Sequence, residues 1–117
     1  MHDAQLFRQW LRGEAEQVLV HVVADGMAIL GMAMASMRPE LLSKEPSAHL
    51  EAIAVAEGTE GRGIGKQLLQ AIEEDAKARG ALTITLHVFA ANARARSLYE
   101  KAGYEGELMR YIKPLSE

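Results

Sequence analysis

Cysteine is absent from this sequence of 117 residues. Disulfide bonds, thiolate nucleophiles and thiolate metal ligands are therefore excluded within it. A long apolar run is also lacking, because the opening stretch MHDAQLFRQWLRGE is mixed in character and fits neither a signal peptide nor a membrane span. We therefore expect a cytoplasmic protein that does not bind membranes.

An excess of positive charge is lacking as well. The net charge is −3, which argues against binding to nucleic acid or to an anionic membrane surface. The histidines do not have the spacing of metal ligands, so no metal is expected; they are His2, His21, His49 and His87. The composition, with 49% hydrophobic and 25% charged residues, is ordinary for a soluble globular protein, and the length fits one domain over residues 1–117.

The first half of the chain contains one helix pattern and three strand patterns. Residues 3–12 carry apolar side chains at i, i+3 and i+4, which predicts a short helix. Two β-rich runs, residues 17–24 and 27–37, flank Asp25-Gly26, a strong signal for an antiparallel hairpin. A loop leads to a third strand at residues 48–56. Two-residue alternation places four residues of this strand on one face: His49, Glu51, Ile53 and Val55.

The second half of the chain predicts a helix, a strand and another helix. The apolar stripe of residues 63–79 ends before Gly80, a typical residue after a helix C-terminus. The alternating run 81–88 is expected to form a strand parallel and adjacent to the third strand, because a helix connects the two. Asn92 can cap a helix that runs to about residue 102, and a last extended segment should follow as one more strand.

The stretch TEGRGIGKQLL, residues 59–69, places three glycines directly before the first of these helices. A helix N-terminus offers unpaired N–H groups and a positive dipole end, and glycines let an anion approach closely. The stretch matches neither the P-loop pattern, which requires Ser or Thr after Gly-Lys, nor the dinucleotide pattern G-x-G-x-x-G. From the glycines alone, a phosphate cradle and a flexible turn are equally good interpretations.

Three segments together resemble the GNAT superfamily of acetyl-CoA-dependent N-acyltransferases. They are HLEAIAV at 49–55, EGRGIGKQLL at 60–69 and NARARSLYEKAGY at 92–104. The phosphate motif of the family has its glycines where Gly63 and Gly65 stand, and a basic or polar residue at the place of Arg62. Its later pattern, Asn-x-x-Ala-x-x-Leu-Tyr-x-Lys-x-Gly followed by an aromatic residue, is matched at every marked position. The second pattern, at the right distance behind the first, makes the resemblance specific.

The resemblance covers residues 27–115 and implies an α/β (α+β) fold with a mixed, mostly antiparallel central sheet flanked by helices. The first strand and one helix of the family have no counterpart before this region. We therefore expect an open acceptor side, and the apolar strand surface left uncovered favours a homodimer.

The same resemblance implies acetyl-CoA as co-substrate and an amine as acceptor. The main chain of Ile53, Ala54 and Val55 would bind the pantetheine arm, and Asn92 would contact that arm or cap its helix. The pyrophosphate would bind the N–H groups of Gly61, Arg62, Gly63, Ile64, Gly65 and Lys66. Glu60 departs from the family, which favours Arg or Gln there; its carboxylate would repel phosphates unless it points outward or pairs with Arg62 or Lys66.

The catalytic residues follow from the resemblance too. The amine would attack the acetyl carbonyl directly, and Tyr99 would protonate the departing thiolate. His49 or Glu51 would accept the proton of the amine, and the ordinary pKa of histidine lies near neutrality. Each of these residues could instead have a purely structural place. Tyr99 could be a core tyrosine, and His49 and Glu51 could be partly exposed polar residues of a strand. Four methionines are expected to fill a core or an interface: Met27, Met32, Met34 and Met37.

The function implied is transfer of an acetyl group to a primary amine of a small molecule, peptide or protein. Two alternatives belong to other classes. The chain could be a non-catalytic acyl-CoA-binding sensor or partner subunit, or a domain that has lost the cofactor and serves only in assembly.

Overall fold

The structure is a computed structural model that describes residues 17–116. The helix expected over residues 3–12 lies outside this range. The chain divides into two compact units between His87 and Val88, and each unit is described by itself.

The first unit is built on a four-stranded sheet with the order β1-β2-β3-β4. The strands are β1 (Val18–Asp25), β2 (Ala28–Pro39), β3 (Pro46–Val55) and β4 (Thr83–Leu86). The β1–β2 and β2–β3 pairs are antiparallel, and the β3–β4 pair is parallel. The prediction of a mixed, mostly antiparallel sheet is confirmed, and so is the parallel pairing of the strands before and after the helix.

The hairpin between β1 and β2 turns one residue later than predicted. Asp25 pairs with Ala28, so that Gly26 and Met27 form the loop. Gly26 has a φ of 61°, and the common two-residue hairpin turns require a positive φ at this first loop position. Met27 is fully exposed at the tip, so it is not part of the core of the first unit, and its alternative place in an interface stays a prediction.

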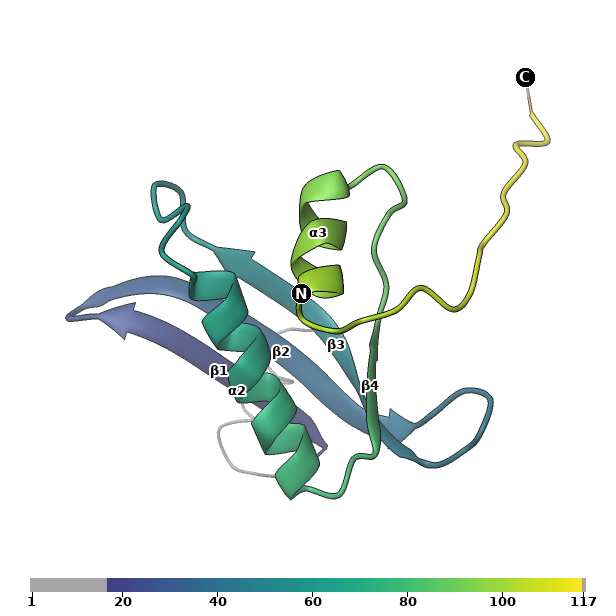
Figure 1. Ribbon diagram of the computed structural model, residues 1–117, viewed down its shortest axis with the longest axis horizontal. Helices are drawn as coiled ribbons and strands as arrows, with labels where there is room; N and C mark the ends of the chain where they lie inside the picture. The colour runs from purple at the N-terminus through teal and green to yellow at the C-terminus, as the bar shows by residue number, and fades with distance from the viewer. Residues whose placement is uncertain (1–16, 117) are drawn as a thin grey trace. The chain divides into compact units, whose positions relative to one another are not determined.

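Helix α2 (Ile64–Ala78) lies across one face of the sheet and packs on β1, β2 and β3 (Figure 1). Its buried residues form the predicted stripe and include Leu69; they are Ile64, Leu68, Leu69, Ile72 and Ala76. Burying each of the large ones contributes about 2 kcal/mol, so this stripe holds the helix to the sheet. Gly80 follows the helix with a φ of 98°, as expected for a C-terminal glycine.

The helix and β2 approach each other most closely at Gly31. A Cβ atom there would lie 2.9 Å from the carbonyl oxygen of Ala54 and 2.9 Å from Cγ2 of Ile64. Because strand side chains alternate, Gly31, Ala33 and Ala35 lie on the face that α2 covers. The residues between them lie on the opposite face.

Two predicted strands differ from the structure. β4 has four residues instead of the eight predicted over 81–88, because its ladder with β3 ends at the pair Leu50–Leu86, next to a bulge in β3. The second unit contains α3 (Ala93–Lys101), and its residues 102–116 include no regular strand. The final strand was predicted wrongly, since the described part of this unit contains no other strand with which it could pair.

Candidate active site

The glycine-rich stretch forms a tight turn between β3 and α2. Three glycines adopt positive φ angles, 83° at Gly58, 80° at Gly61 and 73° at Gly63, and a Cβ at any of them would meet nothing within 4 Å. The hydroxyl of the buried Thr59 donates to the carbonyl of Ala56 at 2.6 Å and holds the start of the turn. The glycines thus serve the backbone conformation and leave the surface beside it open.

The N-terminus of α2 carries N–H groups that the helix itself does not use. Its first internal bond runs from the N–H of Gln67 to the carbonyl of Gly63, 3.0 Å, and no side chain caps the helix. The N–H groups of Ile64, Gly65 and Lys66 precede that bond and point out of the helix end. With the positive end of the dipole, this is the geometry that binds a phosphate or another anion. Arg62 differs, because its N–H donates to the carbonyl of Thr59 at 3.2 Å.

Glu60 is exposed at the entrance of this turn. Among residues 17–116 its carboxylate forms no salt bridge with Arg62 or Lys66. The pairing considered from the sequence is therefore not formed within the described chain, and the outward orientation fits the exposure of Glu60.

The strand before the turn has an unpaired edge. Pairing between β3 and β4 ends at Leu50, whereas β3 continues to Val55. The N–H of Ala56 donates to the carbonyl of Leu30 in β2 at 2.8 Å. Because backbone groups alternate along a strand, those of Ala54 also face β2, and those of Ile53 and Val55 face the open edge. Of the three residues predicted to bind the pantetheine arm through their main chain, Ile53 and Val55 thus have free hydrogen-bonding groups on the β4 side of the strand.

A β-bulge at Glu51 corrects the predicted face of β3. Ala35 pairs with Leu50 and Met34 with Ala52, so Glu51 is an extra residue without an opposite partner. The alternation therefore shifts by one position. His49 and Glu51 lie on the face opposite α2, while Ile53 and Val55 pair with Ala33 and Gly31 and lie on the α2 face.

Six side chains gather on the face opposite α2, and we call them the polar cluster: Ser36, Arg38, His49, Glu51, Thr85 and His87. Nδ1 of His49 lies 2.7 Å from the hydroxyl oxygen of Thr85. The His87 ring stands edge-on to the His49 ring, with centroids 4.8 Å apart. The hydroxyl of Ser36 donates to the Glu51 carboxylate, which also lies 3.7 Å from the guanidinium of Arg38.

The environment of the polar cluster lowers the pKa of His49 below its ordinary value. Burial is the largest cause, since the residue is 8% exposed, and the positive charge of Arg38 adds to it. Glu51 opposes the shift and His87 reinforces it. His49 is therefore neutral at neutral pH, the state in which an imidazole can accept a proton.

Of the two site residues in the second unit, Asn92 directly precedes α3 and Tyr99 lies in its last turn. Asn92 caps the helix, its side-chain oxygen accepting the N–H of Ala95 at 3.1 Å, as one of its predicted roles required. Tyr99 is 8% exposed, and its ring stands edge-on to Tyr104 at a centroid distance of 5.9 Å. Burial raises the pKa of Tyr99, which keeps the phenol protonated and able to donate a proton.

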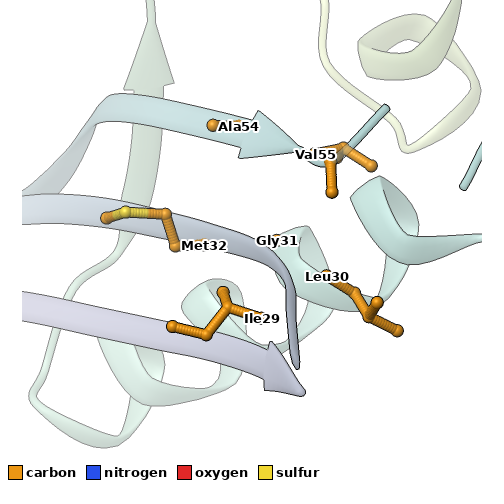
Figure 2. Close-up of a pocket in the computed structure, with 7 residues that line it drawn as sticks. Ile29, Leu30, Gly31, Met32, Ala54 and Val55 are labelled. Atoms are coloured by element: carbon orange, nitrogen blue, oxygen red, sulfur yellow. The ribbon is translucent and has the colours of Figure 1, made fainter. Parts of the chain in front are cut away.

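An apolar hollow of about 220 Å³ lies where β2 begins and β3 ends (Figure 2). Its lining includes no charged side chain and consists of Ile29, Leu30, Gly31, Met32, Ala54, Val55 and Ala56. It offers an apolar surface formed by the paired ends of the two strands.

Sequence reasoning missed four members of the polar cluster: Ser36, Arg38, Thr85 and His87. A signal for two of them was present, because Thr85 and His87 alternate with apolar residues along the strand prediction 81–88. Ser36 and Arg38 had no such signal, since only the β2–β3 register brings them to Glu51.

Among residues 17–116, no group of three or more His, Asp or Glu side chains is placed to hold a metal ion. The helices described there are too short or too polar to span a membrane.

Comparison with known proteins gives consistent matches. The sequence model described as "Acetyltransferase (GNAT) family" matches residues 1–104. The uncharacterized N-acetyltransferase YdgE of Bacillus subtilis is 35% identical over 74 residues, which cover 63% of this chain and 47% of YdgE. The [ribosomal protein bS18]-alanine N-acetyltransferase of Salmonella typhimurium is 38% identical over 66 residues, 56% of this chain and 45% of that protein.

A solved structure supports the same assignment at the level of the fold. A Pyrococcus furiosus protein, provisionally named an acetyl transferase, superimposes with a TM-score of 0.80 at 28% identity, covering 96% of this chain and 74% of that one. The aligned stretches span less than half the length of the two curated relatives.

Proposed function

The chain belongs to the acetyltransferase (GNAT) family, and from this premise we propose that it transfers an acetyl group from acetyl-CoA to a primary amine. One observation carries the proposal. The N-terminus of α2, which no side chain caps, follows the open edge of β3 after the turn at residues 56–63. Helix N–H groups suited to phosphate and a row of free backbone groups therefore lie close together along the chain.

Residues of the first unit suit the two parts of acetyl-CoA. The N–H groups of Gly63, Ile64, Gly65 and Lys66 would receive the pyrophosphate, assisted by the side chains of Arg62 and Lys66. Gly61 gives the turn its shape. The N–H and C=O groups of Ile53 and Val55 would bind the amide groups of the pantetheine arm, and Ala54 would contact it by packing alone.

The chemistry requires one proton acceptor and one proton donor. As the amine nitrogen bonds to the acetyl carbon it loses a proton, and as the carbon–sulfur bond breaks the sulfur gains one. Tyr99, kept protonated by burial, is the proposed donor to sulfur. His49, neutral at neutral pH, or Glu51 is the proposed acceptor from the amine. A backbone N–H at the open edge of β3 would polarise the carbonyl.

Of the two candidate acceptors, we favour His49. The carboxylate of Glu51 already accepts a hydrogen bond from Ser36 and lies 3.7 Å from the guanidinium of Arg38, whereas Nε2 of His49 has no hydrogen-bond partner among residues 17–116. Glu51 is better suited to hold a cationic amine near the site.

Two other functions are distinguished by binding and turnover. A non-catalytic sensor or partner subunit would bind acetyl-CoA without releasing thiol in the presence of any amine. A domain that serves only in assembly would bind no acetyl-CoA. Retention of Tyr99 within the full family pattern favours the enzyme over both.

The test is thiol release from acetyl-CoA by the full chain with a panel of primary amines. The panel comprises a peptide with N-terminal alanine, prompted by the bS18-specific relative, together with an aliphatic diamine and an aminoglycoside. Release with at least one amine supports the enzyme. If no thiol is released although acetyl-CoA binds measurably, the non-catalytic sensor or partner subunit becomes the favoured function.

Tyr99→Phe tests the proton donor. We expect kcat to fall about 100-fold with an unchanged dissociation constant for acetyl-CoA, because only protonation of the thiolate is lost. Tyr111→Phe removes the hydroxyl of a tyrosine that is 85% exposed and serves as the matched control. An unchanged kcat in Tyr99→Phe would show that Tyr99 does not protonate the departing thiolate.

A further inference from the structure

The second ring nitrogen of His49 is the starting observation. Nδ1 is engaged with Thr85, while Nε2 forms no hydrogen bond with any residue in the range 17–116. His49 as a residue is 8% exposed, and a ring nitrogen without a protein partner is costly unless a ligand or a water meets it. Nε2 is therefore the atom of this ring available to an incoming group.

The bond to Thr85 decides whether Nε2 can act as a base. A neutral imidazole carries one proton, on either nitrogen. If Nδ1–H donates to the Thr85 oxygen, Nε2 is bare and can accept a proton. If the Thr85 hydroxyl donates to Nδ1, the proton sits on Nε2 and the ring cannot accept another at that atom.

The protonated ring gives the reason to prefer the first arrangement. Both nitrogens of an imidazolium are donors, so its Nδ1–H needs an acceptor. The Thr85 oxygen supplies one at 2.7 Å before and after proton transfer, and no hydrogen bond has to be rebuilt during the reaction.

We propose that Thr85 is a positioning residue for the acetyl transfer: by accepting Nδ1–H it holds His49 in the tautomer whose Nε2 takes the proton of the acceptor amine. This inference rests on the proposed function. The proton leaves the amine nitrogen as the new carbon–nitrogen bond forms, resides on Nε2 and returns to solvent, while the sulfur departs with the proton from Tyr99.

The groups that face His49 set the pH at which it works. They are Arg38 on β2, Glu51 on β3, Thr85 on β4 and His87, which directly follows β4. Arg38 and His87 disfavour the imidazolium, and burial does so most. Thr85 is the neutral member of this set, and its oxygen stabilises the protonated ring by accepting Nδ1–H.

The pair Ser47–Thr83, two residues before His49–Thr85 in the β3–β4 ladder, provides a matched control. Ser47 pairs with Thr83 as His49 pairs with Thr85, and its hydroxyl lies 2.8 Å from that of Thr83. Ser47 also donates to the carbonyl of Thr83 at 2.9 Å, so Thr83→Val leaves it with a partner. Thr85→Val and Thr83→Val thus make the same change two residues apart on one strand, and Thr85→Ser restores the hydroxyl.

The direct test is nitrogen NMR of the imidazole rings in the full chain, with His49 assigned by the signal lost in His49→Gln. We expect a protonated Nδ1 and a bare Nε2 in the neutral ring. In Thr85→Val we expect a mixture of tautomers and a lower His49 pKa, because the imidazolium loses its acceptor. Thr83→Val and Thr85→Ser should resemble the original chain. A proton on Nε2 in the original chain overturns the proposal.

Kinetics supply the second readout, with whichever amine of the panel releases thiol. Thr85→Val should lower kcat about tenfold with unchanged KM for acetyl-CoA, and should move the acid limb of the pH profile to lower pH. Equal rates and limbs in Thr85→Val and Thr83→Val would contradict the role of Thr85. Absence of thiol release by the original chain would instead contradict the proposed function, and the NMR result would still decide the tautomer.

Discussion

Glu60 is the residue that fits a phosphate site least well. It is exposed beside the N–H groups at the start of α2 and has no ion-pair partner among residues 17–116. A carboxylate about 8 Å from one phosphate charge in water costs about 0.5 kcal/mol, which is roughly a twofold loss of affinity. We expect the helix end and its free N–H groups to outweigh a penalty of this size, so that Glu60 lowers the affinity for acetyl-CoA without abolishing binding.

Replacing Glu60 with glutamine should therefore tighten the binding of acetyl-CoA. We expect a dissociation constant lowered about two- to threefold at low salt, with the gain shrinking as ionic strength rises, because exposed charges are screened. Calorimetric titration measures it. Glu74→Gln is the control, since it removes the same charge about 15 Å further along α2. Equal or weaker binding by Glu60→Gln would mean that this carboxylate does not face the phosphates.

At the scale of elements, one cluster ties edge strand β1 to α2. Nε2 of His21 on β1 lies 2.8 Å from one carboxylate oxygen of Asp75, and Nε of Arg79 donates to the other at 2.9 Å. Burial alone would raise the pKa of Asp75, but the hydrogen bonds from His21 and Arg79 outweigh it and lower the pKa. The ionised carboxylate is therefore stabilised by folding.

Asp75→Asn should destabilise the first unit by about 1 kcal/mol at pH 7, a modest value because the cluster is partly exposed. A lowered folded pKa means that the contribution is complete above the unfolded pKa, about 3.9, and is lost as pH falls through the folded value. Urea unfolding at pH 7 and near pH 3 tests this. The difference between the variant and the original chain should be largest at pH 7 and shrink as pH falls below about 3.9. A difference that does not shrink in acid, or an equal loss in Glu74→Gln, would contradict it.

Local rules predicted the elements that depend on a few neighbouring residues. The hairpin signal at Gly26, the glycine after α2 and the cap at Asn92 each satisfy a need of the adjacent backbone, so the sequence alone reveals them. The bulge at Glu51 could not be predicted, because it exists only in the register between β2 and β3. This one extra residue places Ile53 and Val55 on the other face, and it lies next to the last pair of the β3–β4 ladder.

The active-site features likewise differ in whether they depend on neighbouring residues or on the pairing of distant strands. The glycine positions before α2 follow from turn chemistry and helix geometry, and they were visible in the sequence. The contact between His49 and Thr85 joins residues 36 positions apart and arises only from the parallel pairing of β3 with β4. The roles of Tyr99, His49 and the cofactor-binding residues remain predictions that the experiments above test.

At the scale of the whole molecule, the apolar surface of the first unit bears on assembly. Val20 and Val22 lie opposite Met34 and Met32, on the face that α2 leaves free, and are 42% and 51% exposed. We infer a homodimer that covers the β1–β2 part of this face, beside the polar cluster, because contiguous exposed apolar surface usually marks an interface. Light scattering at micromolar concentration should give about twice the chain mass of 12.8 kDa. A single-chain mass would refute the dimer.

The central claim is that the start of α2 and the open edge of β3 bind acetyl-CoA, and calorimetric titration of the full chain tests it most directly. We predict that acetyl-CoA and CoA bind and that ATP, which has phosphates but no pantetheine arm, does not bind comparably. Absence of binding by acetyl-CoA at millimolar concentration would contradict the account.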